Sequence, residues 1–130
     1  MIEDTSFLLD VLGGDDAALE RLELLERANT PEKVASITVC ELYEGIVRSD
    51  RPTAEREAVL DVLDTKPVVA ADAAIMRLAG QLRGELVLDG RVIDREDCII
   101  AATAMDLGEP VVTGNAEHFE RISGLDVRSY

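Results

Sequence analysis

The sequence predicts an α/β fold in which helices cover both faces of a central parallel sheet of about five strands. Short β-branched segments alternate with longer segments of helical periodicity along the chain. Strands separated by helices favour parallel pairing, because the helical crossover brings the chain back to the same end of the sheet. No repeat, linker or low-complexity tract interrupts this pattern. A single three-layer α/β/α domain spanning residues 1–130 is therefore expected.

The strand candidates are short, and most are rich in valine or isoleucine, which favour extended backbone. Glycine, proline and asparagine stand near their ends, where loops are expected. The five candidates are Met1–Asp4, Lys33–Ser36, Pro67–Ala70, Pro110–Thr113 and Leu125–Ser129.

Six segments have apolar residues at the three- and four-residue spacing of an amphipathic helix. The last begins after Asp94, a good N-cap, and its acidic first turn opposes the positive end of the helix dipole. It ends at "LGEP", where a glycine followed by a proline is typical of a helix stop. The segments are Ser6–Leu12, Asp16–Ala28, Thr38–Arg48, Thr53–Leu63, Ala73–Val87 and Arg95–Leu107.

The charge balance is unusual for a protein that meets nucleic acid. The chain has 27 Asp and Glu against 13 Lys and Arg, a net charge of −14. A protein that binds nucleic acid through a basic surface should have the opposite sign. Either the partner is not nucleic acid, or the acidity is an adaptation to a high-salt cytosol, where charges are strongly screened. The spread of acidic residues over nearly every helix favours the second interpretation.

Other features indicate a cytoplasmic protein without a membrane segment. No apolar run approaches the length of a membrane span, and the N-terminal "MIEDTSFLLDVL" is too short and too acidic for a signal peptide. The two cysteines, Cys40 and Cys98, lie inside apolar-periodic segments. We therefore expect both to be buried free thiols rather than a disulfide pair.

Polar side chains from distant parts of the chain are predicted to meet at one edge of the sheet. Asp4 ends the first strand, and Glu41 lies one turn into the helix after the second. Asp97 lies in the first turn of the last long helix, and Asn115 comes just after the fourth strand. In open parallel sheets, ligands bind beyond the carboxyl ends of the strands. These four side chains therefore form a candidate site.

Such a cluster suits metal-assisted hydrolysis. Carboxylates packed together repel one another and raise each other's pKa. A divalent cation removes that cost, and hard oxygen ligands select Mg²⁺ or Mn²⁺. The cation can also activate water and stabilise charge that develops on a phosphate. It would allow an acidic protein to hold RNA.

Each residue also has a purely structural interpretation. Asp4 could cap the following helix, and Glu41 could close a "TVCE" capping box with Thr38. Asp97 stands at the third position of its helix, and Asn115 could hold a turn. Taken singly, none of these residues is specific for a metal site.

Four blocks, taken together and in order, resemble a known family. They are "IEDTSFLLDVL", "ASITVCELYEGI", "IDREDCIIAATAMDLGEPVVTGN" and "AEHFERISGLDV". Their combination is similar to the PIN-domain ribonucleases, and within these to the VapC-type toxins of toxin–antitoxin pairs. The resemblance runs from residue 2 to about residue 128 and implies a PIN-like fold.

The resemblance also implies roles for individual residues. Asp4, Glu41 and Asp97 would be the metal-binding core for Mg²⁺ or Mn²⁺. The family's fourth position, often acidic, falls on Asn115, which would leave a second metal held weakly or only with substrate. Ser6 would orient Asp4 or a metal-bound water.

The implied function is a metal-dependent endoribonuclease that acts as a toxin on RNA, is paired with an antitoxin protein and forms a homodimer. The alternative is a catalytically degenerate PIN-like module that binds RNA or a partner, which the neutral Asn115 keeps open. His118 is expected at a helix end or in packing rather than as a proton donor.

A phosphoacceptor receiver domain is disfavoured because the third strand candidate ends in alanine and no lysine follows Lys66. A dehalogenase-type phosphatase would need D-x-D after the first strand, where the chain has "EDTSF".

Overall fold

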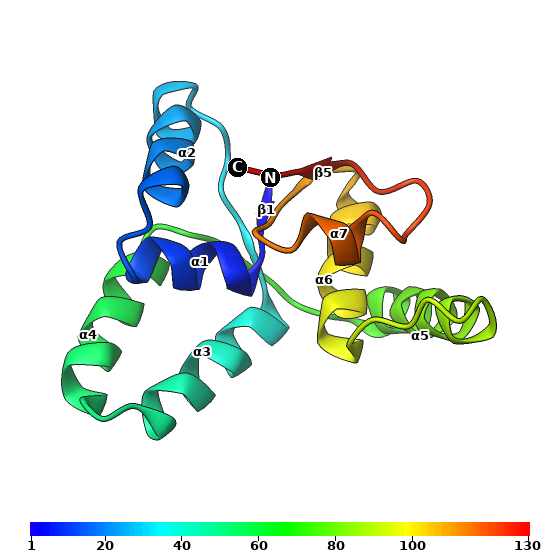
Figure 1. Ribbon diagram of the computed structural model, residues 1–130, viewed down its shortest axis with the longest axis horizontal. Coiled ribbons are helices and arrows are strands. Elements are labelled where there is room, and N and C mark those ends of the chain that lie inside the picture. The colour runs from blue at the N-terminus through cyan, green and yellow to red at the C-terminus, as the bar shows by residue number, and fades with distance from the viewer.

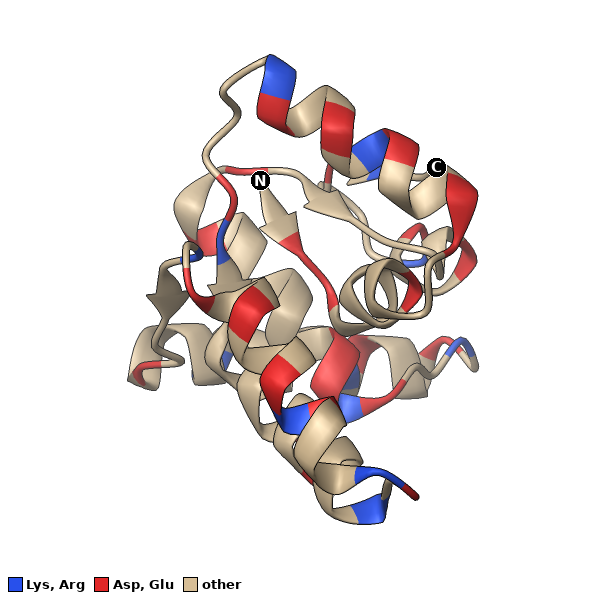
Figure 2. Ribbon diagram, turned by 90° about the vertical axis from the view of Figure 1, so that its left-hand side faces the viewer, with Lys and Arg blue, Asp and Glu red and all other residues tan.

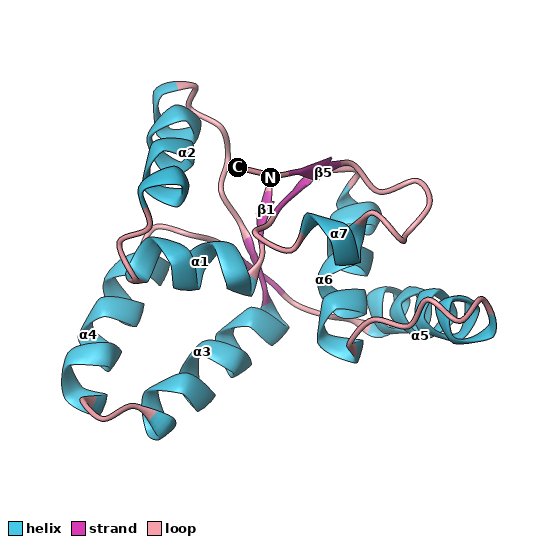
Figure 3. Ribbon diagram, viewed as in Figure 1, coloured by secondary structure: helices cyan, strands magenta, loops and turns pink.

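The computed structural model describes all residues from 1 to 130 and confirms the α/β class with helices on both sides of the strands (Figures 1 and 3). The strands are β1 (Ile2–Glu3), β2 (Val34–Ala35), β3 (Val68–Val69), β4 (Val111–Val112) and β5 (Val127–Arg128). The helices are α1 (Thr5–Leu12), α2 (Asp16–Arg27), α3 (Ser36–Arg48), α4 (Pro52–Leu63), α5 (Ala73–Leu88), α6 (Arg95–Leu107) and α7 (Ala116–Phe119).

All strand pairs are parallel, and each predicted strand is present with a two-residue paired core. The hydrogen bonding divides them into a sheet ordered β1–β4–β5 and a pair β2–β3. A parallel bridge between Ile2 and Lys33 joins the two parts. The order across the molecule is therefore β3–β2–β1–β4–β5, with β1 in the centre.

Alternate strand residues face opposite sides and pack against two different sets of helices. Ile2 and Val111 belong to a cluster of 16 buried residues with α5, α6 and the segment around α7. Val34 and Val112 belong to a cluster of 10 buried residues with α1, α2, α3 and α4. This division produces the expected three layers, with α1–α4 on one side of the strands and α5–α7 on the other (Figure 1).

Two local interpretations were wrong, and one short helix is missing from the predicted set. Helix α3 begins at Ser36, directly after β2, so Thr38 is inside the helix and forms no capping box with Glu41. Cys98 is buried as expected, but Cys40 is exposed. The reason is helical geometry, because the buried side of α3 is built from Thr38, Leu42 and Ile46, and Cys40 lies half a turn away. Helix α7, a single short turn, was not predicted.

The ends of α6 follow the sequence pattern. Asp94 is the N-cap residue as predicted, although its side chain makes no capping hydrogen bond. Gly108 ends the helix with a left-handed backbone of φ 64°, which glycine adopts without a Cβ penalty. These ends fix where the first turn of α6, with Asp97, lies relative to the strands.

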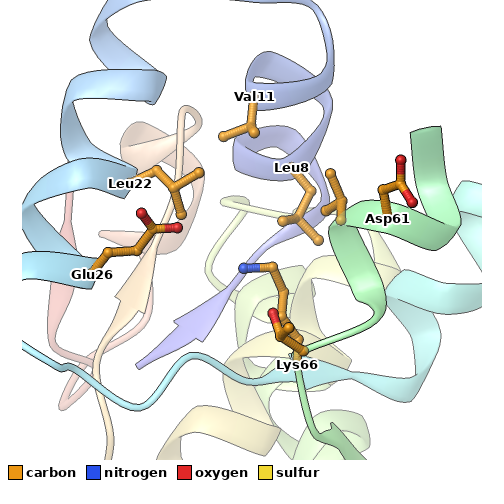
Figure 4. A pocket seen from close by; sticks show the side chains of 8 residues that line it. Leu8, Val11, Leu22, Glu26, Asp61 and Lys66 are labelled. Atoms are coloured by element: carbon orange, nitrogen blue, oxygen red, sulfur yellow. The ribbon is translucent and has the colours of Figure 1, made fainter.

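A buried ion pair lies at the central strand β1. Glu3, on β1, is fully buried, and Lys66 Nζ lies 2.7 Å from its Oε1, outside good hydrogen-bond geometry. The same ammonium donates to Glu32 Oε1 at 2.8 Å. Lys66 also borders a cavity of about 240 Å³ between α1, α2 and α4, into which its side chain extends beside Leu8 (Figure 4). Burial raises the pKa of Glu3 to about 7, against the opposing charge of Lys66.

Acidic residues are spread over the helices rather than gathered in one place (Figure 2). No helix combines the length and the apolar character that crossing a bilayer would require.

Candidate metal and catalytic site

The strand order places the candidate site at the point where the chain reverses direction across the sheet. From β1 the chain moves outward through β2 to β3, and then returns to the other side of β1 to form β4 and β5. Ligands of open α/β sheets bind at such a switch point, beyond the carboxyl ends of the strands. Asp4 follows β1 there, and Thr113 follows β4.

Asp4 is held by hydrogen bonds from three sides, with 2% of its surface exposed. The backbone N–H of Phe7 donates to Oδ1 at 2.8 Å, so Asp4 caps α1. Thr113 Oγ1 donates to Oδ2 at 2.6 Å, and Ser6 Oγ lies 2.9 Å from both carboxylate oxygens. Capping α1 and facing the switch point are therefore compatible roles for this one carboxylate.

Glu41, on α3, is held by Thr5, the first residue of α1. Thr5 Oγ1 donates to Glu41 Oε1 at 2.8 Å and lies 3.1 Å from Thr38 Oγ1. Because Thr5 directly follows Asp4, one dipeptide at the end of β1 fixes two carboxylates. Glu41 is half-buried and keeps one oxygen free of protein hydrogen bonds.

Asp97 reaches the same region from the first turn of α6, with 19% of its side chain exposed. Its Oδ2 lies 3.5 Å from Nδ1 of His118 on α7, a distance too long for a strong hydrogen bond. The sequence indicates only a helix end or a packing position for His118. The structure places it in α7 and also beside a candidate ligand.

Two predicted site residues differ in their placement. Ser6 lies within the Asp4 network as expected, and it also accepts a hydrogen bond of 3.0 Å from the backbone N–H of Gly114. Asn115 is exposed, and its side chain makes no hydrogen bond, although its backbone N–H donates to Thr113 Oγ1 at 2.8 Å. The fold thus brings Asp4, Glu41 and Asp97 to one region and leaves the Asn115 amide outside their contacts.

Thr5 and Thr113 donate hydrogen bonds to Glu41 and Asp4, and the sequence interpretation missed both. Both stand within the blocks that carry the family resemblance, "IEDTSFLLDVL" and "IDREDCIIAATAMDLGEPVVTGN", which imply no role for them. The available clue was position, because each is a hydroxyl residue at or just after the end of a central strand.

The three carboxylates share an electrostatic signature. Burial raises the pKa of Asp4 to about 6, opposed by its hydrogen bonds and reinforced by the charge of Asp97. Burial also raises the pKa of Glu41, and the charges of Asp97, Glu96 and Asp4 add to it. For Asp97 burial again raises the pKa, with the neighbouring charges of Asp94 and Glu96 in the same direction. Each ionised group is thus costly without a counter-charge, and a cation would remove much of that cost.

The fit to a divalent cation is chemical rather than geometrically complete. No group of three His, Cys, Asp or Glu side chains is already close enough together to hold a metal ion. The donors themselves are hard carboxylate oxygens, the kind that Mg²⁺ and Mn²⁺ prefer. Mutual repulsion favours separation of these side chains, so a cation would have to draw them together.

The raised pKa values predict an unusual pH dependence of stability. Asp4 and Glu3, with folded pKa values of about 6 and about 7, take up protons between pH 7.5 and 5.5, whereas their unfolded forms stay ionised. The folded state then binds more protons, so the free energy of unfolding rises as the pH falls, by about 3 kcal/mol. Thermal unfolding with EDTA should show a midpoint about 10 °C higher at pH 5.5 than at pH 7.5. A lower midpoint at pH 5.5 would contradict the raised pKa values of Asp4 and Glu3.

Comparisons with known proteins identify the family of this chain. The PIN domain family model matches residues 1–125. A tRNA(fMet)-specific endonuclease VapC from Shigella flexneri is 34% identical over 92 residues, covering 71% of this chain and 70% of that protein. Ribonuclease VapC2 from Haemophilus influenzae is 31% identical over 112 residues, covering 84% and 85%.

Solved structures are similar over nearly the whole chain. VapBC2 from Rickettsia felis, bound to a DNA fragment from its promoter, gives a TM-score of 0.89 at 25% identity, covering 99% of this chain and 97% of that one. DNA-bound VapBC from Salmonella typhimurium gives a TM-score of 0.86 at 28% identity, covering 98% and 96%. With the carboxylates at the switch point, these likenesses lead to one conclusion: this chain belongs to the PIN-domain family, and within it to the VapC-type toxin ribonucleases.

Proposed function

We propose that this protein is a Mg²⁺- or Mn²⁺-dependent endoribonuclease that acts as the toxin of a toxin–antitoxin pair. The observation that supports the metal dependence is electrostatic: burial raises the pKa of Asp4, Glu41 and Asp97, and the charge of Asp97 adds to the shifts of the other two. Such a set is unfavourable without a counter-charge and suits a hard cation. Membership in a family of ribonucleases supports RNA as the substrate.

Each residue of the proposed site has a distinct task. Asp4, Glu41 and Asp97 would hold the cation, which when bound supplies an activated water and charge stabilisation at the scissile phosphate. Thr5 keeps Glu41 oriented, and Ser6 with Thr113 fixes the Asp4 carboxylate. Each hydrogen bond lowers the freedom of a ligand before substrate arrives, which is the general benefit of oriented ligands.

Asn115 has a role that depends on substrate. It lies at the N-cap of α7 with an exposed, unengaged amide just beyond the end of β4. We assign it to contacts with RNA phosphate or water rather than to the cation. The loops 89–91 and 114–118, which border this edge, would influence which RNA is cut.

An antitoxin protein is proposed as the partner, because the similar structures from Rickettsia felis and Salmonella typhimurium are VapBC complexes. A basic side chain of such a partner would meet the same carboxylates that otherwise hold a cation. A homodimer is also proposed. A single species with monomer mass in sedimentation velocity at micromolar concentration would contradict the dimer.

RNA cleavage by the purified protein, freed of any partner, tests the function. With Mn²⁺ we expect endonucleolytic fragments that disappear with EDTA, and an activity that persists at high salt if the acidity is a salt adaptation. No cleavage by folded protein with either metal at any salt concentration would contradict the proposal. It would favour instead a degenerate module that only binds RNA or a partner.

A further inference from the structure

Tyr130 lies against the turn that follows β4, far from it in sequence. Its ring packs edge-on against Phe7 on α1, with centroids 5.1 Å apart and planes at 64°. Its hydroxyl donates to Asp10 Oδ2, one α-helical turn further along α1. Burial and the nearby Asp10 charge raise the pKa of Tyr130, so the hydroxyl stays protonated and remains a donor. The neighbouring carbonyl of Ser129 accepts a hydrogen bond of 2.8 Å from Arg21.

Gly114, on this turn, lies directly against the Tyr130 side chain. A Cβ at position 114 would lie 2.6 Å from the Tyr130 hydroxyl oxygen and 3.0 Å from Asp10 Oδ2. The first distance is far inside van der Waals contact. Glycine is therefore required here by the close approach of a side chain, not by a left-handed backbone.

The turn held in this way connects directly to a candidate metal ligand. The backbone N–H of Gly114 donates to Ser6 Oγ at 3.0 Å, and Ser6 Oγ lies 2.9 Å from both oxygens of Asp4. Thr113, the residue before Gly114, donates directly to Asp4 at 2.6 Å. Both hydrogen-bonded routes from the turn end on the same carboxylate.

We propose that Tyr130 is a positioning residue, which holds the Thr113–Gly114 turn against α1 so that Ser6 and Thr113 keep Asp4 oriented for its ligand role. This inference rests on the proposed function for its catalytic consequence. The physical claim about the turn concerns the metal-free chain and can be tested there separately.

Tyr130→Ala removes the side chain that packs against the Thr113–Gly114 turn, while the Asp4 carboxylate itself is unchanged. We expect the kcat for RNA cleavage and the affinity for Mn²⁺ to fall by about tenfold, the size typical of groups that orient metal ligands. The KM for RNA should stay within about twofold, because no substrate contact is removed. Tyr130→Phe keeps the ring on Phe7 and should lose less than about threefold in kcat.

Gly114 offers a second route to the same effect. Gly114→Ala should also lower kcat by about tenfold, because the new methyl group meets the Tyr130 hydroxyl. Removing that hydroxyl should relieve most of the conflict, since the nearest tyrosine ring carbon lies at 3.4 Å and Asp10 Oδ2, at 3.0 Å, loses the hydrogen bond that holds it there. The Gly114→Ala/Tyr130→Phe double variant should therefore cleave RNA faster than Gly114→Ala, a coupling that independent effects would not produce.

Tyr43→Ala is the matched control, because Tyr43 and Tyr130 both pack against the same apolar cluster. It removes a ring of equal size without touching the turn, so it should lower the unfolding temperature but not the kcat. Equal loss of kcat in Tyr43→Ala and Tyr130→Ala, following their unfolding temperatures, would overturn the proposal. So would a double variant no faster than Gly114→Ala.

Hydrogen exchange of metal-free protein provides a measurement that does not depend on activity. Tyr130→Ala should speed exchange of the Gly114 amide, the donor to Ser6, by about tenfold relative to wild type, while Tyr43→Ala should not. Unchanged exchange in Tyr130→Ala would overturn the positioning role even if the wild type cleaves RNA. Faster exchange together with an inactive, Mn²⁺-indifferent wild type would instead reject the proposed function and leave the support of the turn intact.

Discussion

Asp97→Asn is expected to reduce metal-dependent RNA cleavage by about a thousandfold or more, because it removes a charged ligand while preserving shape. Asp97 is a cleaner target than Asp4, which also caps α1 and accepts a hydrogen bond from Thr113. The Asp97 side chain is 19% exposed, and its one ion-pair neighbour is His118, at 3.5 Å. The measurement is the initial rate at saturating Mn²⁺, with unfolding temperatures recorded in parallel.

Asp94→Asn is the matched control for this variant. Asp94 lies one turn away at the N-cap of α6, is exposed, and makes no capping hydrogen bond. It should retain activity within about threefold, since it adds only a screened charge to the site. A near wild-type rate in Asp97→Asn with an unchanged metal optimum would show that the site assignment is wrong.

Lys66→Met is expected to produce the largest loss of stability. It leaves the fully buried Glu3 without its counter-charge. In the wild type only 8% of the Lys66 side chain is exposed, so water cannot easily take its place. Removing one partner of a buried pair costs about 3 kcal/mol or more, which corresponds to an unfolding midpoint lower by about 10 °C. The loss should be greatest near pH 8 and smaller at pH 5.5, where Glu3, with its pKa raised to about 7, becomes neutral.

Two further variants separate the buried pair from charge in general. Lys33→Met breaks a more exposed pair with Glu109 at 2.9 Å and should cost less than about 1 kcal/mol. The double variant Glu3→Gln/Lys66→Met should recover part of the loss, because no buried charge remains. Equal destabilisation by Lys33→Met and Lys66→Met in thermal unfolding would contradict this account.

The sequence was sufficient for the layers and the element order, because periodicity distinguishes helices from strands over the whole chain. It was less informative where one spacing fits two roles. The spacing of "TVCE" fits a capping box that includes Glu41, but α3 begins earlier, at Ser36, since the chain passes from β2 into the helix without a loop. Local spacing cannot reveal such a direct junction.

The candidate site was predictable in its carboxylates but not in its supporting contacts. Asp4 and Asp97 could be placed from strand and helix ends, because those ends meet at one edge of the sheet. The hydrogen bond from Thr113 to Asp4 joins residues 109 positions apart, and the contact of Tyr130 with Gly114 joins residues 16 positions apart. Such pairings depend on how β4 and β5 are arranged beside β1, which no local pattern encodes.

The most direct test of the central claim is a calorimetric titration of Mn²⁺ into the metal-free protein and into Glu41→Gln and Asp97→Asn. If these carboxylates form one cation site with Asp4, the wild type should bind Mn²⁺ with release of protons at pH 6, and each variant should bind at least about tenfold more weakly. Equal Mn²⁺ affinity in all three proteins, or no binding by the folded wild type, would contradict the assignment of the metal to these residues.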